Sequence, residues 1–132
     1  MGEAAKLLVN FNDFGCFCKS PLKYEHTICN ISESQLFTNS DQTGIRFHIS
    51  SNRFLAGMIR IIVGKLLEIG YGKLTVGQFE QFLLLKQTPE TIIPTYAQGL
   101  YLSKVTYPYL DLPNRSVFGR MMLATVDWRL AE

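Results

Sequence analysis

Arg60 is the residue whose type and neighbours best suit it to chemistry. Gly57 precedes it by three positions and Gly64 follows it by four, in a stretch that reads as helix, so the three share one stripe with Arg53. A glycine inside a helix destabilises the helix by about 0.5–1 kcal/mol relative to alanine, so two glycines there need a structural reason. Close approach of another backbone or of a substrate is one such reason. Arginine holds a carboxylate or phosphate in two-point geometry. We therefore select Arg60 as the candidate functional side chain. The alternative is a solvated arginine beside glycines that serve helix–sheet packing.

Other polar residues give weaker signals. Arg46 and His48 alternate with apolar residues and could meet RNA, although such a face is more often solvated or covered. The aspartates are scattered, and no two have the spacing of an acid–base pair. A nucleophilic-serine motif and a phosphate-binding loop are both absent from the sequence. The sequence therefore does not indicate a self-sufficient hydrolase or a nucleotide-dependent enzyme.

Composition and cysteine usage describe an ordinary globular domain. The 132 residues are 47% hydrophobic and 18% charged, with a net charge of +2 that permits nucleic-acid binding without demanding it. Cys16 and Cys18 form C-x-C and not the C-x2-C of zinc sites, so we expect small buried thiols and no metal. The most hydrophobic stretch, 54–69, contains three charged residues and should not span a bilayer. No signal peptide is visible, and we expect a cytoplasmic protein without membrane contact.

Hydrophobic periodicity predicts the elements that position these residues. Helices are expected over 3–10, 53–69 and 75–86, and strands over 26–37, 44–51 and 100–107. The turn at 39–44 joins the first two strands into a hairpin. Ser51 or Asn52 would cap the long helix, and Thr75 with Gln78 would form a capping box on the next. This order predicts an α+β fold, with a mixed, mainly antiparallel sheet and helices packed on one face.

The long helix should bury the side opposite Arg60. That side carries five apolar residues: Leu55, Met58, Ile62, Leu66 and Ile69. Residues 111–132 lie beyond the last predicted element. In that tail, Met121, Met122 and Trp128 indicate that it docks on the domain.

Four ordered segments resemble the tRNA pseudouridine synthase A family. Residues 47–70 resemble its strand-to-helix signature, and residues 4–17 resemble its first helix with a D-F-x-x-F segment. Residues 72–74 follow the long helix as in the family, and residues 99–108 resemble its closing strand. The resemblance covers residues 3–108, so residues 1–110 are expected to be the C-terminal domain of such an enzyme, half of its fold, with 111–132 outside the resemblance. One departure is Thr95-Tyr96, where the family usually has Ala-Pro.

The resemblance implies an activity and roles for individual residues. Family members isomerise uridine to pseudouridine in the anticodon stem-loop of tRNA, as homodimers and without metal or organic cofactor. An aspartate in an R-T-D motif attacks the flipped nucleotide, the glycosidic bond breaks, and the base reattaches through carbon. No R-T-D occurs in this sequence, so the N-terminal half that carries it would be a partner and this half alone would be inactive. By position, Arg60 should pair with that aspartate, Asn52 and Arg53 should contact substrate, and Leu100 should line the uracil pocket.

Two alternatives remain open at the level of sequence. The chain could be a non-catalytic RNA-binding module that shares the fold, or a structural or dimerisation domain. An Arg60→Ala change distinguishes them, because only the catalytic interpretation predicts a loss of turnover far larger than the loss of tRNA affinity.

Overall fold

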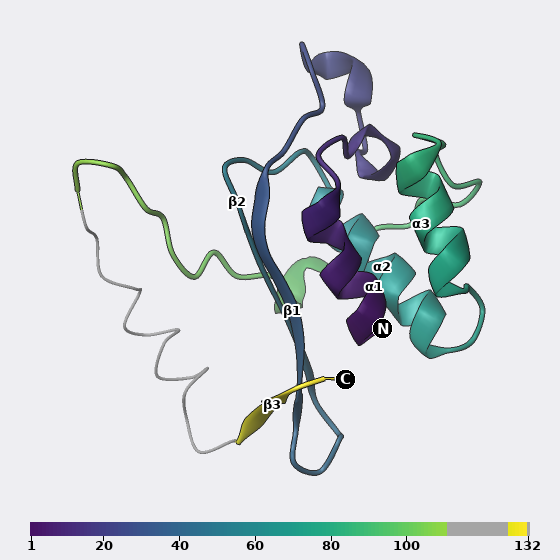
Figure 1. Cartoon of the computed structure of the whole chain (residues 1–132), viewed down its shortest axis with the longest axis vertical. Coiled ribbons are helices and arrows are strands. Elements are labelled where there is room, and N and C mark those ends of the chain that lie inside the picture. The colour runs from purple at the N-terminus through teal and green to yellow at the C-terminus, as the bar shows by residue number, and fades with distance from the viewer. Residues whose placement is uncertain (111–126, 132) are drawn as a thin grey trace.

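Three α-helices lie beside a three-stranded sheet in the computed structural model of the chain, which describes residues 1–110 and 127–131 (Figure 1). The sheet order is β2-β1-β3, and both pairings are antiparallel. Figure 1 shows the helices on one side of the sheet, which confirms the predicted α+β class. None of the helices in the described ranges is long and apolar enough to cross a membrane. The elements are α1 (Gly2–Leu7), β1 (Ile31–Asn39), β2 (Ile45–Ser51), α2 (Met58–Gly70), α3 (Val76–Leu84) and β3 (Trp128–Leu130).

The hairpin of β1 and β2 forms much as the sequence predicts. The turn is closed by the Asn39 side chain, whose Oδ1 accepts the Gly44 N–H at 2.8 Å, while Gln42 adopts a left-handed φ of 57°. β1 begins at Ile31 and not at residue 26. The earlier residues bond elsewhere, because the Cys29 N–H donates to the Asn12 carbonyl and the Thr27 carbonyl accepts the Phe14 N–H. Residues 27–29 are therefore tied to residues 12–14 and not to β2.

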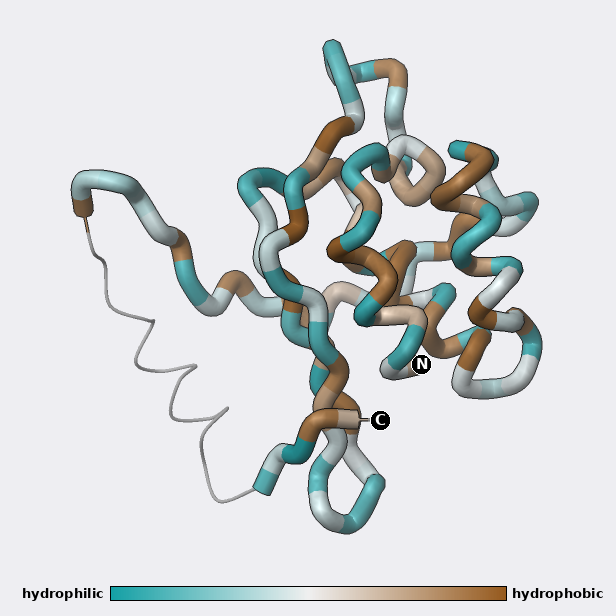
Figure 2. The backbone as a smooth tube through the Cα atoms, viewed as in Figure 1, coloured by the Kyte–Doolittle hydropathy of each residue, from teal (hydrophilic) through white to brown (hydrophobic). Residues whose placement is uncertain are grey.

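The core fills the space between the helices and the sheet. α1 approaches β1 closely through Ala4 and Ala5, both fully buried, and the Ser34 hydroxyl donates to the Ala5 carbonyl at 2.6 Å. Phe17 stacks on Phe79 of α3, with 5.4 Å between ring centroids. Figure 2 shows hydrophobic residues along the helices and the adjoining strands. Four of the five residues predicted to face the core, Leu55, Met58, Ile62 and Leu66, are buried, and Ile69 packs against them half-buried.

The predicted start of the long helix is wrong by five residues. α2 begins at Met58, and its N-cap is Gly57 in the left-handed conformation at φ 70°. Residues 53–57 form a loop because Ala56 is bonded from both sides: its carbonyl accepts the Lys19 N–H at 2.9 Å, and its N–H donates to the Tyr24 hydroxyl at 2.8 Å. These bonds take backbone groups that a longer helix would use for itself.

The predicted strand over 100–107 is also wrong. Those residues run extended without a ladder to any described strand, and Figure 1 shows the segment leaving on the side of the sheet away from the helices. A segment of strand-favouring residues becomes a strand only when another strand offers its edge, and the outer edge of β1 is instead taken at one end by β3, which pairs with Phe37–Asn39. The expected docking of Trp128 is thereby confirmed. Met121 and Met122 lie outside the described residues.

Candidate functional site

Arg60 is the third residue of α2 and is tied to the segment that follows α3. Its Nε donates to the Thr95 carbonyl at 2.5 Å. In return, the Arg60 carbonyl accepts two hydrogen bonds from Thr95, one from the backbone N–H at 3.2 Å and one from the hydroxyl at 3.1 Å. Three hydrogen bonds thus join one residue of α2 to one residue of the segment, and they fix the guanidinium at the end nearest the helix.

The far end of the Arg60 guanidinium remains available. No carboxylate lies within ion-pair distance of this half-buried side chain among the residues that the structure describes. Since Nε is occupied by a carbonyl, an incoming carboxylate would be held end-on, by the two terminal nitrogens. Within residues 1–110 and 127–131, Arg60 is thus a preoriented cation without a counter-ion.

The two glycines that flank Arg60 have separate structural reasons. A Cβ on Gly64 would lie 3.1 Å from the Ile93 carbonyl oxygen, so the residue lets another backbone cross α2. Gly57 needs its positive φ, and a Cβ there would lie 3.3 Å from the Cβ of Lys19. The expectation that another backbone approaches closely is therefore confirmed, and the contacts made at both glycines come from the chain itself.

Asn52 and Arg53 precede α2 instead of lying on it. The Asn52 Oδ1 accepts the Asn30 N–H at 2.8 Å, and its backbone N–H donates to the Asn30 carbonyl, which extends the hairpin past the end of β1. Arg53 lies over the Tyr24 ring, with its Cζ 5.3 Å from the centroid. Its Nη1 donates to the His26 carbonyl at 3.4 Å. The predicted common stripe of Arg53 and Arg60 on one helix is therefore wrong, because Arg53 belongs to the preceding loop.

Leu100 is not part of a strand, and its position is set by the segment that Thr95 anchors to Arg60. It follows the single 3-10 turn Ala97–Gly99 and is five positions beyond Thr95. Its side chain is 48% exposed and covers none of the described core. The bonds between Thr95 and Arg60 therefore hold the start of the segment that contains Leu100 against the first turn of α2. The exposed part of the Leu100 side chain can contact a further surface.

The polar face of β2 is occupied in part by the tail. The Arg46 guanidinium lies over the Trp128 ring at 4.3 Å from its centroid. His48 faces Glu33 across the hairpin, with 3.8 Å between Nδ1 and the carboxylate. Arg46, which is stacked on a ring, and His48, which lies next to a carboxylate, offer a poor surface for RNA. This arrangement favours the alternative that the polar face of β2 is solvated or covered.

The Asp13 carboxylate is engaged by neighbouring groups, and the three cysteines are buried. The carboxylate of Asp13 accepts hydrogen bonds from the Thr27 hydroxyl at 2.6 Å and the Gly15 N–H at 3.1 Å, and Lys86 lies 3.3 Å away. Burial raises the pKa of Asp13, but these partners more than offset it and hold the pKa below its usual 3.8. Burial raises the pKa of the Cys16 thiol to about 12, so it stays protonated. The predicted burial of all three cysteines is confirmed.

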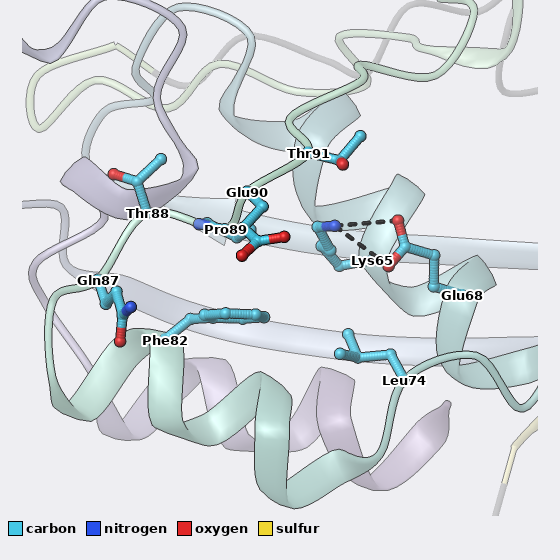
Figure 3. Close-up of a pocket in the computed structure, with 9 residues that line it drawn as sticks. All are labelled: Lys65, Glu68, Leu74, Phe82, Gln87, Thr88, Pro89, Glu90 and Thr91. Carbon is cyan, nitrogen blue, oxygen red and sulfur yellow. Dashed lines mark hydrogen bonds and ion pairs between the residues drawn. The ribbon is translucent and has the colours of Figure 1, made fainter.

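A pocket of about 460 Å³ lies between α2, α3 and the segment after α3 (Figure 3). None of the predicted site residues lines it. Lys65 lines it, and its side chain is almost fully buried and bonded to both oxygens of Glu68, at 2.9 and 3.1 Å. Figure 3 shows Phe82 forming part of the wall on the α3 side. Lys65, the one basic residue in the lining, is thus paired with Glu68 and not available as a cation for a ligand. In the described parts of the chain, no group of histidine, cysteine, aspartate and glutamate could hold a metal ion.

Two residues of this site, Thr95 and Lys19, were not predicted from the sequence. Thr95 lies 35 positions from Arg60, and its role depends on the path of the chain after α3. Lys19 meets the start of α2 through a backbone bond. Gly57 was the only trace of that contact in the sequence, because a glycine beside a helix start permits both the conformation and the approach.

Comparison with known proteins agrees with the resemblance. The family model for tRNA pseudouridine synthase matches residues 4–108. Proteins named tRNA pseudouridine synthase A match from Bacteroides thetaiotaomicron, 39% identical over 82% of this chain and 40% of the relative, and from Chlorobaculum tepidum, 33% identical over 81% and 42%. One from Shewanella loihica is 36% identical over 93% of this chain and 47% of the relative. The chain thus spans less than half the length of these relatives. The match covers most of the chain, which therefore belongs to the tRNA pseudouridine synthase family.

Proposed function

We propose that residues 1–110 are the C-terminal domain of a tRNA pseudouridine synthase and supply the arginine that orients its nucleophile. The aspartate itself would come from the N-terminal half of the same enzyme, with which this domain would form one cleft. The observation that carries the proposal is Arg60, whose Nε is held by Thr95 while no described carboxylate pairs with its terminal nitrogens.

The chemistry assigned to Arg60 follows from its fixed orientation. A guanidinium that is already held by Thr95 loses little conformational entropy when it accepts a carboxylate in two-point geometry. The positive charge lowers the pKa of that carboxylate, so the aspartate remains ionised and aimed when the flipped nucleotide arrives. Arg60 would thus act on the nucleophile, and Leu100 with Asn52 and Arg53 would act on the substrate.

The substrate we propose is uridine in the anticodon stem-loop of tRNA. The isomerisation breaks the glycosidic bond and rejoins the base through carbon, which requires the nucleotide to leave its stack. The complete enzyme would be a cytoplasmic homodimer, and the reaction needs neither metal nor organic cofactor. These features rest on the family and on the site residues taken together.

Domain replacement tests the proposal. This chain is fused behind the N-terminal half of the Shewanella loihica relative, which is expected from the family resemblance to supply the nucleophilic aspartate, and pseudouridine in tRNA is measured by mass spectrometry. We expect the fusion to modify tRNA and the isolated chain to form no pseudouridine. Turnover by the isolated chain would refute the claim that the nucleophile lies elsewhere.

A folded but inactive fusion would refute the proposal if a fusion with the relative's own C-terminal half, built through the same junction, is active. A matched pair of variants ties the activity to the site. Arg60→Ala removes the proposed orienting group, whereas Arg129→Ala removes an exposed arginine of β3 that pairs only with Asp127 among the described carboxylates. Only the first should abolish turnover.

A further inference from the structure

Basic and aromatic residues from two loops gather at the start of α2. Lys19 precedes the turn Pro21–Lys23, Lys23 is its last residue, and Arg53 comes from the loop after β2. Both lysines are exposed, and Arg53 is half-buried. We call these three residues, with Tyr24 and His26, the α2-entry patch.

Backbone contacts hold the two loops of the patch together. Ala56, in the loop after β2, accepts the Lys19 N–H at 2.9 Å and donates to the Tyr24 hydroxyl at 2.8 Å, so two residues of the first loop are bonded to one residue of the second. Arg53 lies over the Tyr24 ring and is bonded to the His26 carbonyl. These contacts fix where Lys19 and Arg53 emerge, which lowers the entropy that a ligand must overcome to engage them.

The charge of the patch is not neutralised within the described structure. None of its three cations takes part in an ion pair among residues 1–110 and 127–131. Glu25 is the one acidic residue in the segment 19–26, against the two lysines there and Arg53. Clustered cations with an aromatic ring between them match the phosphates and sugars of a nucleic-acid backbone.

We propose that the α2-entry patch binds backbone phosphates of the tRNA next to the target uridine. The patch lies at the N-terminal end of α2, where Arg60 occupies the first turn. An extruded nucleotide must be held by the strand on either side, and contacts to phosphates provide that register without reading sequence. The inference rests on the proposed function for its substrate and adds the surface that grips it.

Salt-dependent binding of this chain to labelled tRNA tests the inference. Anisotropy titrations at several KCl concentrations give the slope of log K against log salt, which changes by about 0.7–0.9 for each phosphate contact. The test variant is Lys19→Gln with Lys23→Gln. The matched control is Lys6→Gln with Lys73→Gln, two exposed lysines of α1 and of the loop after α2. Circular dichroism verifies that both variants fold.

The test variant should lose about 1.5 from the magnitude of the slope, as expected for two phosphate contacts, and the control should keep the slope of the unmodified chain. Arg53→Gln should lower the slope by about one contact. Equal slopes for test variant and control, or a slope near zero for the unmodified chain, would overturn the inference, and the second result would favour an acidic protein as the partner. The fusion's pseudouridine yield separates this failure from failure of the proposed function, because an active fusion with unchanged slopes refutes only the patch.

Discussion

Replacing Gly57 by alanine tests how the chain places Arg60. Gly57 caps α2 at φ 70°, a conformation that costs an alanine about 1–2 kcal/mol. The new Cβ would also lie 3.3 Å from that of Lys19, tight enough to displace the loop bonded to Ala56 by a few tenths of an ångström. We therefore expect Gly57→Ala to lower the free energy of unfolding by about 1–2 kcal/mol.

Gly77 provides the matched control for this change. It lies in the first turn of α3, and the nearest atom to an added Cβ is the Thr75 hydroxyl oxygen at 3.9 Å. Gly77→Ala should raise the free energy of unfolding by about 0.5–1 kcal/mol, through helix propensity. In urea, the two variants should differ in midpoint by roughly 1 M, with an m value of about 2 kcal/mol/M.

The two Gly→Ala substitutions should change the free energy of unfolding in opposite directions, and this difference in sign is the test. If Gly57→Ala proved as stable as the unmodified chain or more stable, the left-handed cap would not exist and α2 would begin earlier, as periodicity alone predicts. The placement of Lys19 and Arg60 argued above would then have no structural basis.

The described contacts and exposed surface also predict the effects of substitutions at Asp13 and Thr75 and the association state of the chain. Because the pKa of Asp13 lies below 3.8 in the folded state, its stabilisation is present above that pH and is lost as pH falls through the folded-state pKa. Asp13→Asn should thus flatten the fall of urea midpoints between pH 6 and pH 3, and an unchanged profile would contradict the assignment. Thr75→Ala removes the capping box of α3 and should cost about 1 kcal/mol, whereas Thr75→Ser should retain most of the stability; equal losses would exclude a capping role. The isolated chain should self-associate in sedimentation experiments, because residues 93–110 expose many apolar side chains, including Tyr96 at 88% and Tyr109 at 84%. A monodisperse monomer would argue against that.

Local patterns predicted the elements whose stability is local. The hairpin turn is made by Asn39 and its close neighbours, and the capping box by Thr75 and Gln78, so their spacing in sequence is the spacing that matters. The buried side of α2 followed from its 3.6-residue period. The selection of Arg60 rested on the same kind of signal, a charge framed by two glycines.

The errors arose where distant segments compete for backbone groups. Ala56 had no visible reason to end a helical pattern until Lys19 and Tyr24 were seen to bond it. Residues 100–107 are rich in residues that favour strands, yet the edge of β1 is taken at one end by Trp128–Leu130. Thr95 illustrates the same limit at the site, since its three bonds to Arg60 span 35 positions. Such contacts depend on topology, which periodicity does not encode.

The most direct measurement compares turnover and tRNA affinity for Arg60→Ala in the fused enzyme. Loss of a preoriented electrostatic partner at a reacting centre costs about 10²–10³-fold in kcat. We expect a fall in kcat of that size with the Kd for tRNA changed by less than about threefold, since the guanidinium would contact the aspartate and not the RNA. Equal losses in kcat and affinity would make Arg60 an RNA-binding residue, and no loss in either would leave the domain a structural role; each result contradicts an arginine that orients the nucleophile.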